Sequence, residues 1–407
     1  MANPQAYKHI PSLRFPEFVN DGEWDYVPGN ELFAPIVNKN HNSDLPVLAI
    51  TQDQGAVPRE LIDYNVIVSD KSIAGYKVVE IGDFIISLRS FQGGIEYSNY
   101  KGLCSPAYIV LRRKNDSICN DFYRHYFKSK KYIQDLNRNL EGIRDGKMIS
   151  YQQFSEIKIP FSPLAEQKRI AECLSSIDNM ITECNNKLEQ LKCHKKGLMQ
   201  QLFTPPTRSN SHAFIPRLRF PEFNNTKEWE VKKLGDICTF LDNKRIPLKD
   251  SERAKIHGRY PYYGASGIID YVNNYIFDGE YILLSEDGAN IILRNSPLAF
   301  IIKGKCWVNN HAHVLETKAG NNIYYVCHLL ESMNYERLNT GTAQPKLNRE
   351  NCEKIELPIP SFEEQCKIAE SLNSIDNMVI SYSDKMTMLS RHKKGLMQQM
   401  FPNNQMN

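Results

Sequence analysis

Apolar residues recur at steps of three and four along two long stretches of the chain, which places them on one stripe of an α-helix. The stripes start at Ile170 and Ile368 and run through ten positions each, nine of them apolar and one a lysine at the same place in both. A pattern sustained over so many turns predicts a coiled-coil seam. The seam comprises Ile170, Leu174, Ile177, Ile181, Cys184, Leu188, Leu191 and Lys195 in the first helix and Ile368, Leu372, Ile375, Val379, Tyr382, Met386, Leu389 and Lys393 in the second.

A helix over about residues 163 to 203 would be about 60 Å long, and its narrow stripe needs a partner. The other copy is the natural partner, and the alternative is that each helix packs on its own domain. We expect antiparallel pairing in which the numbers of facing residues sum to about 566–567. This register places Lys195 close to Glu370 and Lys393 close to Glu172.

Signals for a helix start precede both stripes. Prolines stand just before each helix, and Ser361 and Glu364 have the spacing of a capping box. In that motif the serine and the glutamate each accept a hydrogen bond from a backbone N–H that the first helical turn leaves unpaired.

The remaining sequence favours short strands separated by turn residues. Runs of this type are YNVIVSD, DFIISLRS, SPAYIVLRRK, YILLSEDGANIIL and PLAFIIKG. Helical stretches are expected near 121–140 and 323–338. The predicted fold class is therefore α+β, with two α+β domains separated by two long helices that form an antiparallel coiled-coil spacer.

Two different segments of the chain occur twice. PSLRFPEFVNDGEW at 11–24 matches PRLRFPEFNNTKEW at 216–229 in 10 of 14 positions, and the octapeptide HKKGLMQQ stands at 194–201 and again at 392–399. A repeat of this length indicates a tandem duplication that creates a pseudo-two-fold chain, not a solenoid. Between the repeated segments lie variable regions at about 25–156 and 230–354, and TPPTRSNSHAF at 204–214 is the expected linker. The expected division is into four parts, a first domain at 1–156, a first helix at 157–204, a linker and second domain at 205–354, and a second helix with its tail at 355–407.

Length and composition are those of a globular protein of two or more domains. The start of the chain has no apolar segment of a secretory signal, and no run of about 18 apolar residues predicts a membrane span. Ten cysteines occur without a C-x-x-C pair. They indicate free thiols in a reducing compartment, so we expect a cytoplasmic protein without a membrane partner.

Charge is unevenly distributed along the chain. The net charge is only +3, which by itself argues against a general polyanion binder. Residues 1–100 carry 7 basic and 13 acidic side chains, whereas residues 101–156 carry 11 basic and 6 acidic ones. A local basic face of this kind fits a phosphate footprint, with an ordinary solvated surface as the alternative.

Motifs for catalysis are missing. GIRDGKM at 142–148 lacks the spacing of a phosphate-binding loop, and the sequence contains no G-x-G-x-x-G, no G-x-S-x-G and no Asn/Asp-Pro-Pro-aromatic tetrapeptide. His311 and His313 could belong to a metal site, but a polar turn or strand is the favoured interpretation because no third ligand stands near. We therefore predict no catalytic residue and no metal in this chain, and a protein that positions something instead of reacting with it.

The repeated RFPEF and W entry, the variable domain, the IPxPxxEEQxxIAxxLxxID helix and the KKGLMQQ end together resemble the specificity subunit of type I restriction–modification systems. The resemblance covers about residues 11–401, in two copies. It implies a non-catalytic subunit with two target recognition domains, each reading one half of a bipartite, asymmetric site in double-stranded DNA. It also implies two methyltransferase subunits docked on the scaffold, with restriction subunits joined through them. S-adenosylmethionine, ATP and Mg would then belong to these partners.

The candidate DNA contacts are mostly basic and polar side chains, because Arg and Lys suit phosphates and guanine whereas Asn and Gln suit adenine. For each of them an ordinary surface or turn role is the alternative. In the first domain they are Arg89, Ser90, Gln92, Gly93, Arg112, Arg113, Arg144, Asp145 and Lys147. In the second they are Lys244, Arg245, Arg253, Lys255, Arg259, Tyr262, Tyr263, Ser266, Arg294, Asn309, Asn310, Gln344 and Lys346.

Two other functions stay open on the sequence. The chain could be a coiled-coil scaffold that joins two domains for ligands other than DNA, or a self-sufficient DNA methyltransferase or nuclease. A steep dependence of DNA binding on salt would argue against the first of these. The missing motifs argue against the second.

Overall fold

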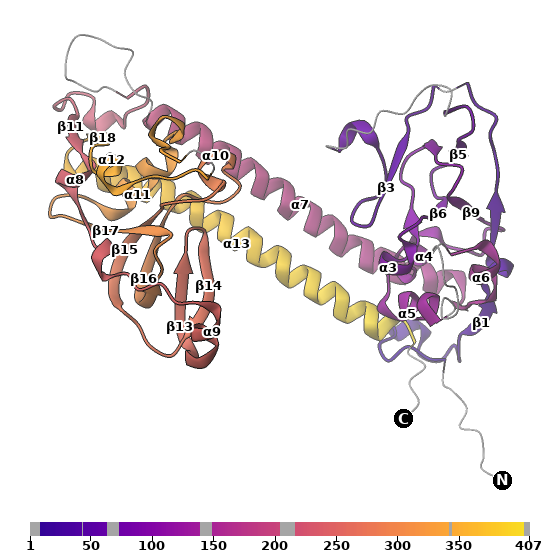
Figure 1. The fold of residues 1–407 in the computed structure, drawn as a ribbon. Helices are drawn as coiled ribbons and strands as arrows, with labels where there is room; N and C mark the ends of the chain where they lie inside the picture. The colour runs from indigo at the N-terminus through magenta and orange to yellow at the C-terminus, as the bar shows by residue number, and fades with distance from the viewer. Residues whose placement is uncertain are drawn as a thin grey trace. The chain divides into compact units, whose positions relative to one another are not determined.

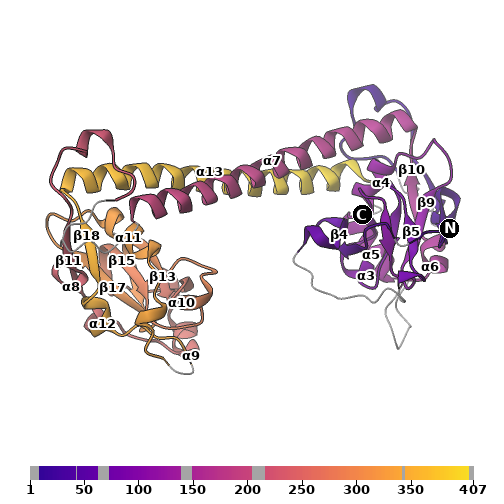
Figure 2. The same cartoon turned by 90° about the horizontal axis from the view of Figure 1, so that it is seen from above.

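The computed structural model describes residues 9–42, 44–62, 73–138, 149–203, 216–341 and 344–402. The chain divides into two compact units. The first unit consists of Met1–Cys184 and Lys385–Asn407, and the second of Asn185–Asp384. The two long helices, α7 (Leu164–Leu202) and α13 (Phe362–Met400), are therefore each shared between the units (Figures 1 and 2).

The first unit is built from short strands and helices around an aromatic core. Its elements before α7 are η1 (Pro16–Phe18), β1 (Asp25–Pro28), α1 (Gly29–Leu32), β2 (Phe33–Ile36), β3 (Leu48–Thr51), β4 (Gly55–Pro58), η2 (Arg59–Leu61), β5 (Lys77–Val79), β6 (Phe84–Ile86), α3 (Ser90–Gly93), β7 (Glu96–Tyr97), β8 (Gly102–Cys104), β9 (Ile109–Arg113), α4 (Asn120–Tyr126), α5 (Lys130–Arg138), α6 (Tyr151–Glu156) and β10 (Lys158–Phe161). A four-stranded sheet has the order β2-β9-β6-β7, and β3-β4, β5-β8 and β1-β10 form two-stranded sheets. Phe33 lies in the core, with edge-to-face contacts to Phe84 and Tyr123.

The second unit has a larger sheet. Its elements between α7 and α13 are η3 (Pro221–Phe223), β11 (Glu230–Lys233), α8 (Leu234–Ile237), β12 (Cys238–Phe240), η4 (Asp242–Lys244), α9 (Asp250–Arg253), η5 (Ala254–Ile256), β13 (His257–Gly264), β14 (Gly267–Val272), β15 (Phe277–Ser285), α10 (Asn290–Leu293), β16 (Ala299–Val308), β17 (Ala312–Thr317), α11 (Ile323–Ser332), η6 (Glu336–Leu338), α12 (Arg349–Glu353) and β18 (Glu356–Ile359). Six strands have the order β12-β17-β15-β16-β13-β14, in which only β13 and β16 pair parallel, and β11 pairs with β18.

These elements confirm the predicted α+β class. The runs DFIISLRS, SPAYIVLRRK and PLAFIIKG contain strands β6, β9 and β16, and the predicted helical stretches contain α4, α5 and α11. YILLSEDGANIIL is only partly strand, since Asn290–Leu293 form α10. YNVIVSD and the linker at 204–214 lie outside the described residues.

The helices pair antiparallel within each unit, as predicted. In the first unit, Ile170 and Leu174 from the start of α7 share a core with Leu396 and Met400 from the end of α13. In the second unit, the end of α7 packs in the same way with the start of α13. All the predicted seam residues are buried or half-buried.

The partners of the two seam lysines differ from the expectation. Lys393 binds Asp178 at 2.6 Å, not Glu172, and Lys195 binds Asp376 at 2.6 Å, not Glu370. Side chains on a helix lean toward the N-terminus of their own helix. In an antiparallel pair this lean carries the long lysine side chain to a higher-numbered position on the other helix.

A buried ion pair joins the repeated entry segment to the start of the following helix. Arg14 donates to both carboxylate oxygens of Glu166, at 2.7 and 2.8 Å, and the indole of Trp24 donates to the same carboxylate at 2.9 Å. Arg219 binds Glu364 in the same bidentate way at 2.8 and 2.7 Å. Both carboxylates are fully buried, so each needs its arginine to offset the cost of desolvation.

This ion pair changes the predicted capping box. The N–H of Glu364 donates to the Ser361 hydroxyl at 3.3 Å, as expected. The carboxylate of Glu364, however, accepts from Arg219 because the entry segment places a guanidinium within reach. The glutamate therefore connects two distant segments and does not reinforce its own helix start.

The glutamine after each of these glutamates ties the variable region to the helix. The Gln167 side chain accepts from the Cys119 N–H at 2.9 Å and donates to the Ser162 carbonyl at 2.7 Å. Gln365 makes the same two bonds with the Asn322 N–H and the Pro360 carbonyl, at 2.8 and 3.1 Å. The β1-β10 and β11-β18 pairs hold the two ends of each variable region side by side, and the glutamines fix an interior point of each region to the helix start.

Each repeated octapeptide is followed by a buried phenylalanine, Phe203 or Phe401, that packs in the unit formed by the variable region of the other repeat. We call these two rings the plugs. Phe401, just after the second octapeptide, packs edge-to-face on Phe122 and Tyr126 with ring centroids 5.4 Å apart in both cases. Phe203, just after the first, packs on Tyr325 at 5.7 Å. The last glutamine of each octapeptide accepts through its carbonyl a hydrogen bond from Leu13 or Leu218 of the entry segments. The octapeptide and its phenylalanine occur twice because each unit has an aromatic site and an entry segment for one copy of them.

Replacing either plug ring should destabilise only the unit that it enters. We expect Phe401→Ala to lower the stability of the first unit by about 3–5 kcal/mol, because a buried aromatic ring is lost and a cavity is left. Hydrogen exchange should speed up in the strands of the first unit and not in the six-stranded sheet. The matched variant Phe203→Ala should show the reverse, and faster exchange in both units for either variant would contradict independent seats.

Candidate nucleic-acid interface

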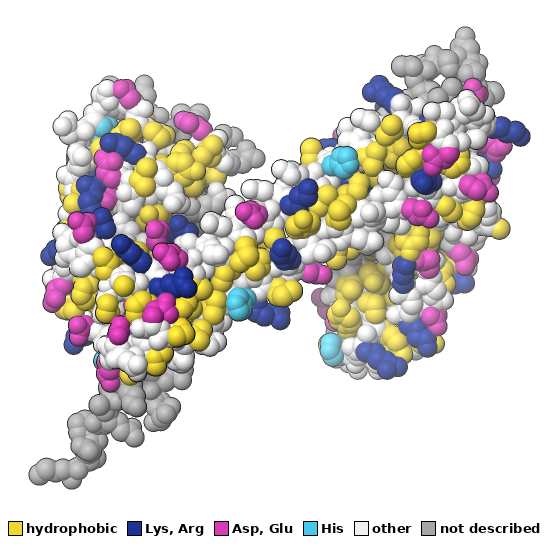
Figure 3. All heavy atoms as spheres, turned by 180° about the vertical axis from the view of Figure 1, so that it is seen from behind, with side chains coloured by type: hydrophobic (Ala, Val, Ile, Leu, Met, Phe, Trp, Pro, Cys, Tyr) yellow, Lys and Arg dark blue, Asp and Glu magenta, His cyan; other side chains and the backbone are white. Residues whose placement is uncertain are grey.

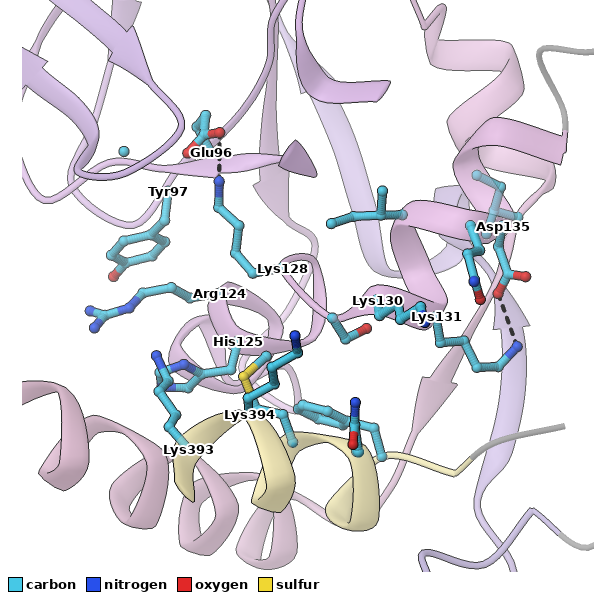
Figure 4. A pocket seen from close by; sticks show the side chains of 18 of the residues that line it. Glu96, Tyr97, Arg124, His125, Lys128, Lys130, Lys131, Asp135, Lys393 and Lys394 are labelled. Atoms are coloured by element: carbon cyan, nitrogen blue, oxygen red, sulfur yellow. Dashed lines mark hydrogen bonds and ion pairs between the residues drawn. The ribbon is translucent and has the colours of Figure 1, made fainter. Parts of the chain in front are cut away.

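A groove with a volume of about 2330 Å³ opens in the first unit along α4, α5 and the last turns of α13 (Figure 4). Five of its cationic side chains come from the basic stretch at 101–156, and two come from the second octapeptide. They are Arg124, Lys128, Lys130, Lys131, Arg138, Lys393 and Lys394. Many charged side chains line the groove, which suits a polyanion better than a small apolar ligand.

Several of these cations already have protein partners. Lys128 binds Glu96 at 2.6 Å and the Gly93 carbonyl at 3.0 Å, and Lys131 binds Asp135 at 3.0 Å (Figure 4). Burial raises the pKa of Glu96, and the charge of Lys128 opposes that rise. These pairs fix the walls of the groove.

Two lysines of the groove have no partner among the described residues. Lys130 and Lys394 are exposed, and no hydrogen bond or ion pair joins either of them to another described residue. Arg124 is held loosely, 3.6 Å from Asp178 and 3.8 Å from Asp121, with its guanidinium 5.5 Å from the centre of the Tyr97 ring. These three cations can exchange weak contacts or water for phosphate oxygens.

The predicted contacts of the first domain lie partly beside this groove. Arg89 and Gln92 are exposed on the turn of α3, whose Gly93 carbonyl binds the groove residue Lys128, whereas the Ser90 side chain is buried. Arg112 and Arg113 do not line the groove. Their guanidinium groups bind Asp83 and the Asp116–Ile118 turn, and so support β9. Arg144, Asp145 and Lys147 lie outside the described residues.

In the second unit the structure brings several predicted residues together around Glu286. Arg245 binds the Glu286 carboxylate at 2.7 Å and the Ala312 carbonyl at 2.7 Å, and Lys346 lies 3.4 Å from the same carboxylate. Arg245 is also 3.5 Å from the carbonyl of Asn310, which is exposed. Further along the same turn, the buried Asn309 donates its N–H to Tyr263. The loops after β12, β15 and β16 therefore meet at one end of the sheet.

The other predicted residues of the second unit are dispersed. Tyr262 is buried, and Arg253 stacks over its ring and binds two aspartates, so both support the β13-β14 hairpin. Arg294 has the left-handed φ of 54° and binds Glu331. The guanidinium of the exposed Arg259 donates to the Tyr260 hydroxyl at 2.9 Å. The other predicted residues with exposed side chains are Lys244, Lys255, Ser266 and Gln344.

The two histidines that could have marked a metal site bind aspartates. His311 lies in the turn before β17 and contacts Asp287 at 2.8 Å, and the buried His313 on β17 contacts Asp242 at 2.7 Å. Burial disfavours the charged ring, but Asp242 outweighs it and raises the pKa of His313 to about 10. Within the described ranges, no group of three or more His, Cys, Asp or Glu side chains could hold a metal ion. None of the helices in that part of the chain combines the length and apolar character that a bilayer span requires.

Comparison with known proteins assigns the two halves to one family. The family model for the type I restriction modification DNA specificity domain matches residues 30–192 and again residues 226–385. The chain belongs to this family. Each match begins near the entry strand of a unit and runs into the following long helix, so a DNA specificity domain in this chain is a variable region with its helix.

Individual members of the family resemble the chain over different lengths. The type I restriction enzyme MjaVIII specificity subunit of Methanocaldococcus jannaschii is 26% identical over 425 residues, covering 97% of this chain and 94% of its own. A Haemophilus influenzae protein with a specificity-subunit name is 34% identical over 166 residues, which is 41% of either chain. The crystal structure of the S subunit from M. genitalium has the same fold, with a TM-score of 0.62 at 18% identity and coverage of 97% of this chain and 99% of its own.

Sequence reasoning missed a polar junction that each unit contains. In the first unit it consists of His125, Asp178 and Lys393, and in the second of His328, Asp376 and Lys195. The aspartates and lysines stand in the repeated segments, so the repeat carried a signal for them. The histidines stand in the variable regions, where no repeated motif marks them.

His125 should make the stability of the first unit sensitive to acid. Burial, with the charges of Lys393 and Arg124, lowers the pKa of His125 to about 3. The unfolded chain takes up a proton on this ring below about pH 6.5 whereas the folded chain does not, so stability is complete above that pH and declines below it. Between about pH 7 and 5.5 the loss should be about 1.3 kcal/mol from this ring alone.

Urea unfolding at the two pH values checks this expectation in His125→Gln, which should lack that part of the acid loss. The exposed His194 on α7 provides a control, and His194→Gln should keep the acid loss of the wild type. An acid loss in His125→Gln equal to that of the wild type would show that the ring is protonated in the folded chain.

Proposed function

We propose that this chain is the non-catalytic specificity subunit of a type I restriction–modification system, which reads a bipartite, asymmetric DNA target. The observation that carries the proposal is the position of the two family matches. They fall on two units that share a frame, by which we mean the entry segment, the strand pair that closes the variable region, the start of the long helix and the octapeptide with its following phenylalanine. The sheets that the two frames carry differ in size and strand order. One frame repeated with two different reading domains supports one DNA sequence read in two unlike halves.

The phosphate contacts of the first half are proposed to lie in the groove of the first unit. Lys130, Lys394 and Arg124 supply positive charge without a strong partner in the part of the chain that the structure describes, and the turn that carries Arg89 and Gln92 borders the groove through Gly93. Contacts of this kind orient a duplex without reading its sequence, while side chains on the turn can reach base edges. In the second unit, the loops around Glu286 are proposed to contact the bases of the second half of the target.

The repeated frame supports a second part of the proposal, the positioning of partners. Because the entry segment, the helix start and the plug occur twice with the same contacts, they offer the same surface to two copies of one partner. Two methyltransferase subunits would occupy these surfaces, and restriction subunits would join through them. S-adenosylmethionine, ATP and Mg would serve the chemistry of those subunits.

The mixed surface charges agree with a protein that binds DNA along one limited part of its surface. Basic and acidic side chains are interspersed on the face shown in Figure 3, in keeping with a net charge of +3. Electrostatic attraction to DNA would then depend on a few placed cations, which can be removed one at a time.

Removing a free groove lysine should reduce the salt dependence of DNA binding. We expect Lys130→Gln and Lys394→Gln each to lower the slope of log affinity against log salt by about 0.9, because each variant loses one phosphate contact. Titrations of a target duplex with the assembled complex at several salt concentrations measure the slope. The exposed Lys101, which pairs with Glu80 outside the groove, is the matched control, and Lys101→Gln should keep the full slope.

Exchange of residues 25–156 for the first variable region of another family member should change one half of the target and leave the other half intact. The frame contacts of Glu166 and Gln167 come from outside the exchanged segment or from its backbone, so assembly should survive. Selection of bound duplexes from a random-sequence pool identifies both halves. Changes in both halves would show that the two domains do not read independently, and absence of any selected sequence with the native chain would reject the proposed function.

A further inference from the structure

The variable regions, which share little sequence, place a histidine at the same point of each unit. His125 on α4 lies with its Nδ1 3.8 Å from Asp178 and its Nε2 3.1 Å from the Ser175 hydroxyl. His328 on α11 lies with its Nε2 3.8 Å from Asp376 and 2.9 Å from the Asn373 side chain. Ser175 and Asp178 correspond to Asn373 and Asp376 through the repeat. The histidine of each domain therefore lies against the same two repeat positions of the long helix that follows that domain in the chain.

The third member of each junction comes from the other repeat. Lys393 of α13 binds both carboxylate oxygens of Asp178 at 2.6 Å, and Lys195 of α7 binds those of Asp376 at 2.6 and 2.7 Å. Each aspartate thus contacts a domain helix on one side and the opposite long helix on the other. The lysines are about one-fifth exposed, which places the contacts at the edge of the seam and not in open solvent.

The junctions lie at a distance from the attachment at the start of each long helix. The first attachment is at the helix start, where Arg14 binds Glu166 in the first unit and Arg219 binds Glu364 in the second. Asp178 is twelve residues beyond Glu166, and Asp376 is twelve beyond Glu364, which is about 18 Å along a helix. The strand pair, the glutamine and the ring of Phe401 or Phe203 also attach each domain. The junction adds a polar contact about 18 Å from the helix start, and this contact further restricts rotation of the domain about its helices.

We propose that Lys393 and Lys195 are positioning residues that, through Asp178 and Asp376, hold each recognition domain at one angle on its helix pair and so limit the gap between the two halves of the DNA target. The inference rests on the proposed function. A lysine in an apolar seam position lowers stability but can enforce one arrangement. Here that arrangement includes the domain, because the aspartate that the lysine holds also faces the domain histidine.

The test uses the chain assembled with its modification subunits and a library of duplexes that carry the native half-sites at different gaps. The share of methylation at gaps one base pair longer or shorter than the preferred one measures the freedom of the domains. In Lys393→Met we expect this share to rise about threefold or more, with the half-site sequences unchanged. Lys195→Met should act alike from the second unit, and Lys393→Arg, which keeps the charge, should restore the narrow range.

The matched control is Lys192→Met. Lys192 is an exposed lysine of α7 that pairs with Glu189 of its own helix, so its loss should leave the gap range unchanged. If Lys393→Met fails to fold, the isosteric Asp178→Asn takes its place in the same assay. A gap range as narrow as that of the wild type in folded junction variants would overturn the inference while the proposed function stands. A wild-type complex without any preferred gap would overturn the proposed function and this inference with it.

Discussion

The buried carboxylate at the start of each long helix is the constraint on which the rest of the structure depends. Glu166 and Glu364 are fully buried, and each has two guanidinium hydrogen bonds from an arginine about 150 residues earlier in the chain. A buried charge without such a partner would cost several kcal/mol. The entry segment must therefore return to the helix start, and the ends of the variable region between them are brought together.

That closure explains how one frame can carry two different domains. Once β1 pairs with β10, or β11 with β18, the repeated segments make three further kinds of contact with the variable region. These are a backbone N–H for the glutamine, aromatic rings against Phe401 or Phe203, and a histidine that faces the repeated aspartate. Everything beyond these contacts is free to differ. The first unit uses this freedom for a four-stranded sheet with small satellites, and the second for a six-stranded sheet. Domains that differ in this way present different loops to a ligand, while their attachments stay the same.

Periodicity predicted the long helices well because a seam is a local property of the sequence. The expected span of about 163 to 203 compares with Leu164–Leu202, and the antiparallel pairing was confirmed. The ion-pair partners of individual side chains were predicted poorly. Lys195 was expected near Glu370 and binds Asp376, and Glu364 was expected to cap its own helix and binds Arg219. Such choices depend on side-chain direction and on segments that only the fold brings near.

For the candidate interface too, the sequence predicted the region but not the individual residues. The basic stretch at 101–156 pointed to the groove, but charge alone could not separate Arg112, which is bound to Asp83, from Lys130, which is free among the described residues. The junction histidines had no sequence signal, because His125 and His328 stand in regions that share little sequence. Their equivalence became visible only through the aspartates that they face.

Mapping of methylated bases in the DNA of cells that express this chain with its modification subunits tests the central claim most directly. Two unlike domains on one repeated frame predict a methylated sequence with two unequal specific parts, separated by a gap of constant length and unspecified bases. One uninterrupted motif, or two identical halves, would contradict the account.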